Sequence, residues 1–88
     1  MELTDLRMFR AIVEEGSVTR AAAALHVAQS ALSRQIQQLE QELGVTLLRR
    51  LDRGVVPTEA GLLLRGRITD LLEQARQLKE SLGEIAAE

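Results

Sequence analysis

The spacing of apolar residues predicts that the first part of the chain is helical. An apolar residue returns every three or four positions near the start, in the order Leu6, Phe9, Ile12 and Val13. This spacing predicts a helix from about Leu3 to Glu15 that ends at Gly16. Ser17 is a good N-cap for a second, short helix. The buried side of that helix would be formed by Val18, Ala21, Ala22 and Leu25.

A third helix is predicted from Gln29 to Leu43, after a tight connection. Its apolar residues share one face: Leu32, Ile36, Leu39 and Leu43. Gly44 is placed to end this helix. Two short consecutive helices joined by a tight turn, the second of them amphipathic, are typical of a helix-turn-helix.

The pattern changes after Gly44, where short apolar runs lie on both sides of a turn sequence that ends in Gly54. We predict a hairpin with strands at Thr46–Arg49 and Val55–Pro57, since proline is tolerated at the end of a strand. A hairpin directly after the helix pair makes the motif a winged helix-turn-helix. Thr58 would then cap a long final helix.

The predicted fold class is therefore mostly α. A winged helix-turn-helix domain occupies residues 1–58, and its wing is the small β-hairpin. A long C-terminal dimerisation helix follows over residues 59–88.

An apolar stripe runs along the final helix to its end. Its members alternate spacings of four and three residues: Leu64, Ile68, Leu71, Ala75, Leu78, Leu82 and Ile85. If the helix folded back on its own small domain, it would cover only about two turns, around Leu62 to Leu64, and leave Leu71 to Ile85 exposed. We therefore predict a homodimer through this helix. Gly61 and Gly66 lower the helix propensity, which indicates a close approach by another element.

The outer face of the third helix carries short hydrogen-bonding groups and no acid before Glu40. Two rows make up this face: Gln29, Ser33 and Gln37 in one, and Ser30, Arg34 and Gln38 in the next. Glutamine pairs with adenine, arginine with guanine, and serine with several base edges or a phosphate. Such a face is typical of a helix that reads the major groove of DNA, and a solvated polar surface is the alternative.

Charge distribution favours DNA more than net charge does. The 88 residues carry a formal charge of −2, whereas nonspecific nucleic-acid binders are usually basic. Between Gly16 and Leu39, however, the only charged residues are Arg20 and Arg34. Three arginines then cluster beside the predicted turn: Arg49, Arg50 and Arg53. Arginines on a wing contact the minor groove or the DNA backbone, and an ordinary solubilising turn is the alternative.

The composition argues against other classes of protein. The chain has no cysteine and a single histidine, so disulfides and thiolate metal sites are excluded, and His26 is most simply a turn residue at the surface. It also lacks a glycine-rich phosphate loop and a converging pair of acids. We expect no enzymatic activity, no cofactor and no metal. With no long apolar run and no basic leader, we expect a cytoplasmic protein without a membrane segment.

Several motifs occur together between Leu3 and about Leu64, namely GSVTRAA, LHVAQSALSRQIQQLEQELG and PTEAG. In this order and spacing they resemble the N-terminal domain of LysR-type transcriptional regulators. The resemblance implies a linker helix that dimerises, and an imperfect palindromic operator in double-stranded DNA. It also implies a tetramer in the full-length protein. A small-molecule inducer would bind a separate effector-binding domain, which we expect to be absent from this chain.

The resemblance places the DNA contacts at the start of the third helix and on the wing. The DNA-binding residues predicted from it and from the helix face are Gln29, Ser30, Ala31, Ser33, Arg34, Gln37, Arg50 and Arg53. Weaker contacts with the DNA backbone are predicted for Ser17, Thr19 and Arg20. Ala28 stands where many relatives have serine, which removes a side-chain cap worth about 1 kcal/mol. A helical protein-interaction module without DNA readout is the competing hypothesis, but it gives no reason for the acid-free span.

Overall fold

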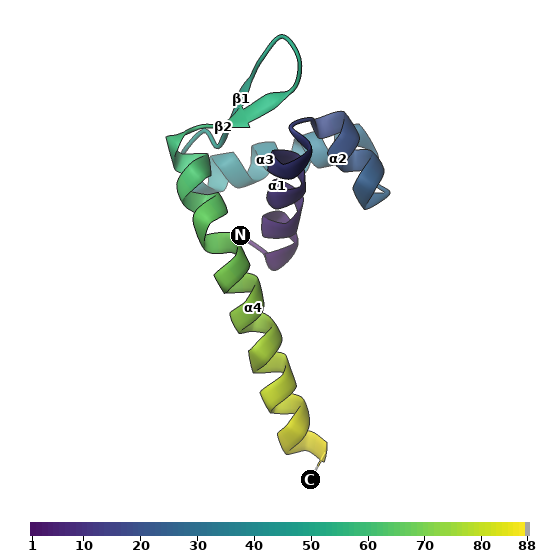
Figure 1. Ribbon diagram of the computed structural model, residues 1–88, viewed down its shortest axis with the longest axis vertical. Coiled ribbons are helices and arrows are strands. Elements are labelled where there is room, and N and C mark those ends of the chain that lie inside the picture. The colour runs from purple at the N-terminus through teal and green to yellow at the C-terminus, as the bar shows by residue number, and fades with distance from the viewer. Residues whose placement is uncertain (88) are drawn as a thin grey trace.

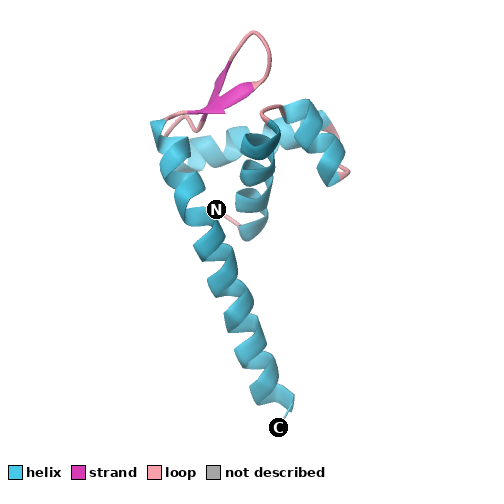
Figure 2. Cartoon of the chain, in the orientation of Figure 1, coloured by secondary structure: helices cyan, strands magenta, loops and turns pink. Residues whose placement is uncertain are grey.

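Helices make up most of the molecule, with a small hairpin standing out from them (Figures 1 and 2). The computed structural model describes residues 1–87. Its elements in chain order are α1 (Leu3–Glu15), α2 (Val18–Leu25), α3 (Gln29–Leu43), β1 (Leu48–Arg50), β2 (Val55–Pro57) and α4 (Glu59–Ala87). The predicted bounds of α1 and α3 are confirmed, and the winged helix-turn-helix is the observed fold.

The helix ends follow from local chemistry. Gly16 ends α1 and Gly44 ends α3, both in the left-handed conformation. The Ser17 hydroxyl accepts a hydrogen bond from the Arg20 backbone N–H at 3.1 Å, as expected of an N-cap. Ala28 occupies the same position for α3 and offers no side-chain cap. The single histidine, His26, ends α2 with a φ of 58° at the exposed turn.

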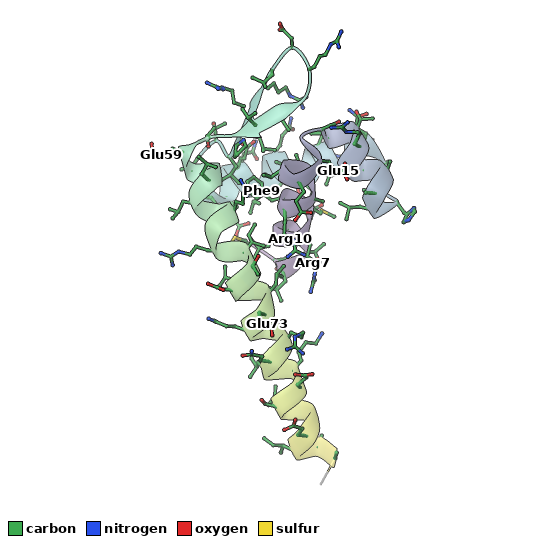
Figure 3. All side chains as sticks on the ribbon, in the orientation of Figure 1. Arg7, Phe9, Arg10, Glu15, Glu59 and Glu73 are labelled. Carbon is green, nitrogen blue, oxygen red and sulfur yellow. The ribbon has the colours of Figure 1, made fainter. Side chains whose placement is uncertain are left out.

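The core lies where α1, α2, α3 and the upper part of α4 meet, with the Phe9 ring inside it (Figure 3). Its largest fully buried side chains are Phe9, Ile12, Leu32, Leu39, Leu47 and Ile68. The predicted apolar stripes are thus largely inside. Three of their members differ: Val13 and Leu25 are only partly buried, and Leu43 is 39% exposed. Leu43 lies in the last turn of α3 and lines a surface groove with residues from the start of α4.

The first strand begins two residues later than predicted, at Leu48 instead of Thr46. Its register pairs Leu48 with Pro57 and Arg50 with Val55. The Thr46 and Leu47 carbonyls instead accept hydrogen bonds from Thr58, at 2.6 and 3.0 Å. Because these backbone groups bond to the cap of α4, they lie outside the ladder. The second strand agrees with its predicted bounds.

The first turns of α4 are seated closely on the hairpin. A Cβ atom added to Gly61 would lie 2.1 Å from the Leu47 carbonyl oxygen, so only glycine permits this approach. The predicted close approach is therefore confirmed at Gly61. At Gly66 a Cβ atom would meet nothing within 4 Å in its own chain, so the prediction there remains untested.

The assignment of Ile68 to the dimer interface is wrong, because this side chain is fully buried in the core of its own chain. Leu64 and Leu72 also pack against that core. The helix therefore covers its own domain for longer than the two turns expected from the sequence. Farther along, α4 leaves the domain and extends alone to the C-terminal end (Figure 1).

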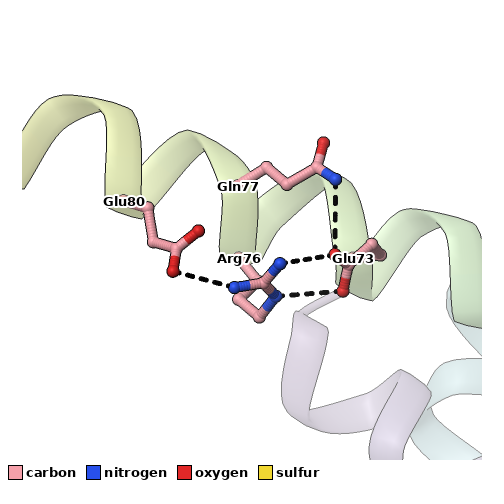
Figure 4. A network of polar contacts seen from close by, with 4 residues as sticks. All are labelled: Glu73, Arg76, Gln77 and Glu80. Carbon is pink, nitrogen blue, oxygen red and sulfur yellow. Dashed lines mark hydrogen bonds and ion pairs between the residues drawn. The ribbon is translucent and has the colours of Figure 1, made fainter.

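Polar contacts line the extended part of α4 (Figure 4). Arg76 donates two hydrogen bonds to the Glu73 carboxylate, at 2.6 and 3.0 Å, and lies 2.9 Å from Glu80. The guanidinium lowers the pKa of Glu73. These side chains lie on the side of the helix away from the apolar stripe, so α4 is amphipathic beyond the domain. No helix within residues 1–87 combines the length and apolar character that a membrane crossing requires.

Candidate nucleic-acid interface

The predicted base-reading residues lie on the open face of α3. Gln29, Ser30, Ala31, Arg34 and Gln37 are exposed, and Ser33 is half-buried. The opposite face of the same helix is buried through Leu32, Ile36 and Leu39. The 3.6-residue repeat thus separates an apolar side from a polar one, and the polar side carries no acid between Gln29 and Leu39.

The hairpin presents Arg50 from β1 and Arg53 from the turn, both exposed. Its base is fixed to the connection between α1 and α2, because the Val55 N–H donates to the Gly16 carbonyl at 3.0 Å. Gly54 lies against the same carbonyl, with a φ of 84° and no room for a side chain. These contacts hold the wing beside the N-terminal end of α2.

Two surface hollows show which predicted residues come together. The first, the α2–wing hollow, has a volume of about 270 Å³ and is lined by Gly16, Ser17, Arg20, Arg53 and Gly54. It unites two of the predicted backbone contacts with a wing arginine. The Arg20 guanidinium is held there by a hydrogen bond of 2.6 Å to the Glu15 carbonyl. Positive charge from two separate segments therefore meets at one place.

The second, the α3–wing hollow, measures about 90 Å³ and joins the base-reading face to β1. Its lining residues are Val18, Ser33, Ile36, Gln37, Glu40, Leu48, Arg50 and Val55. Ser33, Gln37 and Arg50 are predicted site residues that are brought together here. The other predicted residues line neither hollow: Thr19, Arg34 and the first turn of α3, Gln29 to Ala31.

The arginines of this face are free of carboxylate partners in the described part of the chain. Within residues 1–87, ion pairs join Arg10 to Glu14, Arg76 to Glu73 and Glu80, and the N-terminal ammonium to Glu42. Arg34, Arg50 and Arg53 take part in none of them. Unpaired guanidinium groups on an acid-poor face create the local positive potential that phosphate requires.

Sequence reasoning missed three residues that support this face. The Asp5 carboxylate accepts a hydrogen bond of 3.0 Å from the Gln35 amide, which ties α1 to α3, and Asp5 is buried. The Glu40 carboxylate accepts hydrogen bonds from the backbone of the segment that leads into β1. The only signal for Glu40 is that an acid near a helix C-terminus is electrostatically unfavourable.

The chain also has an apolar surface away from this face. A groove of about 360 Å³ lies where the end of α3 meets α4, and we call it the α4 groove. It is lined by Leu43, Val45, Leu47, Ala60, Leu63, Leu64, Arg67 and Leu71. The helix beyond it exposes Leu78, Leu82 and Ile85, each by more than half. An apolar surface of this extent is unusual in a soluble monomer. No cluster of three or more acidic or histidine side chains suited to a metal ion occurs among residues 1–87.

A helix pair whose second helix has an exposed polar face, followed directly by a β-hairpin, places this chain in the class of winged helix-turn-helix proteins. Comparison with known sequences gives the family. The model described as "Bacterial regulatory helix-turn-helix protein, lysR family" matches residues 3–62. The chain belongs to this family, as the motifs predicted.

Regulators of known name are similar over nearly the whole chain. The HTH-type transcriptional regulator BenM of Acinetobacter baylyi is 46% identical over 99% of this chain. The nitrogen assimilation regulatory protein nac of Klebsiella aerogenes is 44% identical over 97%. The chain spans only 29% and 28% of the lengths of these two proteins.

Solved structures share the fold. The BenM DNA-binding domain in its complex with catB site 1 DNA is 45% identical, with a TM-score of 0.90, and the match covers 100% of this chain and 99% of that one. The CbnR DNA-binding domain in a DNA complex is 39% identical, with a TM-score of 0.89 and full coverage of both chains. The long α4 is thus part of the shared architecture.

Proposed function

We propose that this chain binds double-stranded DNA sequence-specifically, as the DNA-binding and dimerisation part of a transcriptional regulator. One observation carries the proposal: the wing brings Arg53 beside Ser17 and Arg20 of the α2 end, and Arg50 beside Ser33 and Gln37 of the base-reading face of α3. Relatives with this fold have been solved as DNA complexes. For a protein with this function we also expect a cytoplasmic location, no enzymatic activity and no cofactor.

The segments of this surface have different roles. α3 lies in the major groove, where Gln29, Ser30, Ser33, Arg34 and Gln37 reach base edges. Ala31 offers a methyl group that can pack on thymine. Arg50 and Arg53 contact the minor groove or the backbone, while Ser17, Thr19 and Arg20 face phosphates beside α2.

The protein acts as a homodimer through α4. The stripe of exposed Leu71, Leu78, Leu82 and Ile85, with the half-buried Ala75 between them, pairs with a second chain, and Leu64 contributes from the edge of the α4 groove. Two-fold symmetry then presents two copies of α3 to the two halves of an imperfect palindrome. Tetramer formation and regulation by a small-molecule inducer would belong to the full-length regulator.

The test separates base reading from charge by comparing two substitutions on duplexes selected from a random library. Arg34→Ala should cost about 1–3 kcal/mol on the selected site and relax selectivity at one position. Arg53→Ala should weaken all duplexes alike and make the log–log salt slope shallower by about 0.9. Arg7→Ala on α1 is the matched control, because it removes the same charge outside both hollows.

Two results would contradict the proposal. The first is affinity that does not change between low and physiological salt, since each phosphate contact releases counterions. The second is an unchanged selection profile for Arg34→Ala. A chain that dimerises but selects no duplex would favour the protein-interaction module instead.

A further inference from the structure

Glu40 uses both of its acceptor groups on the segment between α3 and β1. Its backbone carbonyl accepts hydrogen bonds from the N–H groups of Gly44 and Val45, at 2.8 and 3.2 Å. Its carboxylate accepts from Leu47 and Leu48, at 2.6 and 3.3 Å. One residue therefore satisfies four of the five backbone donors from Gly44 to Leu48. Buried backbone donors need such partners, and the Leu47 side chain is fully buried.

The position of this carboxylate is unfavourable for α3 itself. The last turns of α3 contain Glu40 and Glu42 and no basic residue, although the negative end of the helix dipole disfavours acids there. Glu42 is exposed, and its carboxylate pairs with the N-terminal ammonium. Glu40 is half-buried and turned toward the hairpin. The unfavourable position of Glu40 at the C-terminus of α3 is offset by its hydrogen bonds to Leu47 and Leu48, which indicates that Glu40 positions this segment.

The hydrogen bonds continue from this segment into α4. The Leu47 carbonyl accepts from the Thr58 N–H at 3.0 Å, and the Thr46 carbonyl accepts from the Thr58 hydroxyl at 2.6 Å. The Thr58 hydroxyl oxygen in turn accepts from the Gly61 N–H at 3.1 Å. The end of α3, the start of β1 and the first turn of α4 are thus joined by one chain of polar contacts.

We propose that Glu40 is a positioning residue for DNA binding, which fixes β1 and its Arg50 relative to the base-reading face of α3. Arg50 lies two residues beyond Leu48, and Glu40 and Arg50 line the same α3–wing hollow. The other strand is anchored separately, through the bond from Val55 to the Gly16 carbonyl. Without the Glu40 acceptor, the segment that leads into β1 keeps its bonds to Thr58 but loses its hydrogen bonds to the side chain of α3. This inference rests on the proposed DNA binding.

The experiment compares two side chains of similar size that differ in their acceptor. Glu40→Gln keeps an amide oxygen toward the Leu47 and Leu48 donors, whereas Glu40→Met keeps the length without an oxygen. Glu42→Met is the matched control, because it makes the same change at the neighbouring exposed acid. Glu40→Ala also removes the acceptor, and it tests whether the effect of Glu40→Met comes from the added methionine side chain. Each variant is made with and without Arg50→Ala, and all bind the duplex selected by the wild-type chain.

Coupling between the two sites is the expected result. Arg50→Ala should weaken binding about tenfold in the wild type, in Glu40→Gln and in Glu42→Met, but less than about threefold in Glu40→Met, where the guanidinium has already lost its fixed position. Equal losses in all backgrounds would overturn the proposal, and so would an Arg50→Ala variant that binds as the wild type does. A merely structural role would lower stability without coupling to Arg50.

A DNA-free measurement makes the outcome independent of the proposed function. Amide hydrogen exchange at Leu47 and Leu48 should be slow in the wild type and in Glu40→Gln. It should be at least about tenfold faster in Glu40→Met and Glu40→Ala, while amides of α1 stay protected. Unchanged exchange in these two variants would refute the positioning role by itself. A wild-type chain that binds no duplex would instead refute the proposed function.

Discussion

Two glycines of α4 should respond in opposite directions to the same substitution. Gly61 lies against the Leu47 carbonyl, where an added Cβ atom would be 2.1 Å from the oxygen and 3.0 Å from the Pro57 Cβ atom. Gly66 lies five residues later and has open space around the added atom. Gly61→Ala and Gly66→Ala therefore differ only in what the methyl group meets.

The magnitudes follow from opposing contributions. Replacing an interior helical glycine with alanine stabilises a helix by about 1 kcal/mol; this gain applies in full at Gly66 and at most in full at Gly61, which lies in the first turn of α4. At Gly61, a separation of 2.1 Å forces the backbone apart, and overpacking of this kind costs about 1–3 kcal/mol. The displaced Leu47 carbonyl also loses its bond from Thr58, worth about 1 kcal/mol. We expect Gly61→Ala to lower the free energy of unfolding by about 1–3 kcal/mol and Gly66→Ala to raise it by up to about 1 kcal/mol.

Urea and thermal unfolding at one fixed protein concentration would measure this difference. The concentration must be held constant because dimerisation contributes to apparent stability. A gap of about 2 kcal/mol corresponds to a separation in Tm of at least about 8 °C for a domain of this size. Gly83→Ala, which also adds a methyl group in open space, serves as a second control. If Gly61→Ala were as stable as Gly66→Ala, the close packing of α4 on the hairpin would be refuted.

Three further predictions concern the same helix and the start of α3. Ile68→Ala should destabilise the fold by about 2–5 kcal/mol. Leu78→Glu should leave the fold of the monomer intact but weaken the dimer, as measured by light scattering. A destabilised fold in Leu78→Glu, with a weakened dimer only in Ile68→Ala, would contradict both assigned roles. Ala28→Ser should stabilise the chain by about 0.5–2 kcal/mol in urea unfolding, because the N-cap of α3 has extended dihedrals and no side-chain acceptor; no gain would show that a serine there does not reach the free N–H groups. Arg76 lowers the pKa of Glu73. The pair therefore stabilises α4 at pH values above the ordinary carboxyl pKa, and this contribution disappears as the pH falls through the lowered pKa. Glu73→Gln should remove that part of the pH dependence of unfolding, and an unchanged pH profile would contradict the prediction.

The helices could be predicted because their signals are local. Gly16 and Gly44 end two helices at the predicted positions, and Ser17 caps a third. The start of β1 could not be predicted in the same way. It depends on Glu40 and Thr58, which lie several residues away in the sequence and capture backbone groups of the connecting segment. Hydrogen bonds between segments decide where a strand begins, and apolar spacing does not report them.

The residues of the candidate site could be predicted from the sequence, but which of them lie together could not. The absence of acids in α3 before Glu40 and the arginines near the turn are visible in the sequence. The convergence of Arg20 with Arg53, and of Gln37 with Arg50, depends on how the wing is attached to the rest of the domain. That attachment uses the Gly16 carbonyl, a backbone group that no side-chain pattern reveals.

The stripe along α4 explains why spacing alone assigned Ile68 to the wrong neighbour. An a/d repeat requires burial of each member but does not say whether the covering surface belongs to the same chain. In this fold only the first turns of α4 contact the domain, so neighbouring members of the stripe have different surroundings. Ile68 faces the core, while Leu71 borders the α4 groove. From Leu78 onward there is no domain left to cover the stripe. The same helix thus holds the fold together and offers an apolar surface to a partner, and a shift of α4 on its domain would move that surface relative to α3.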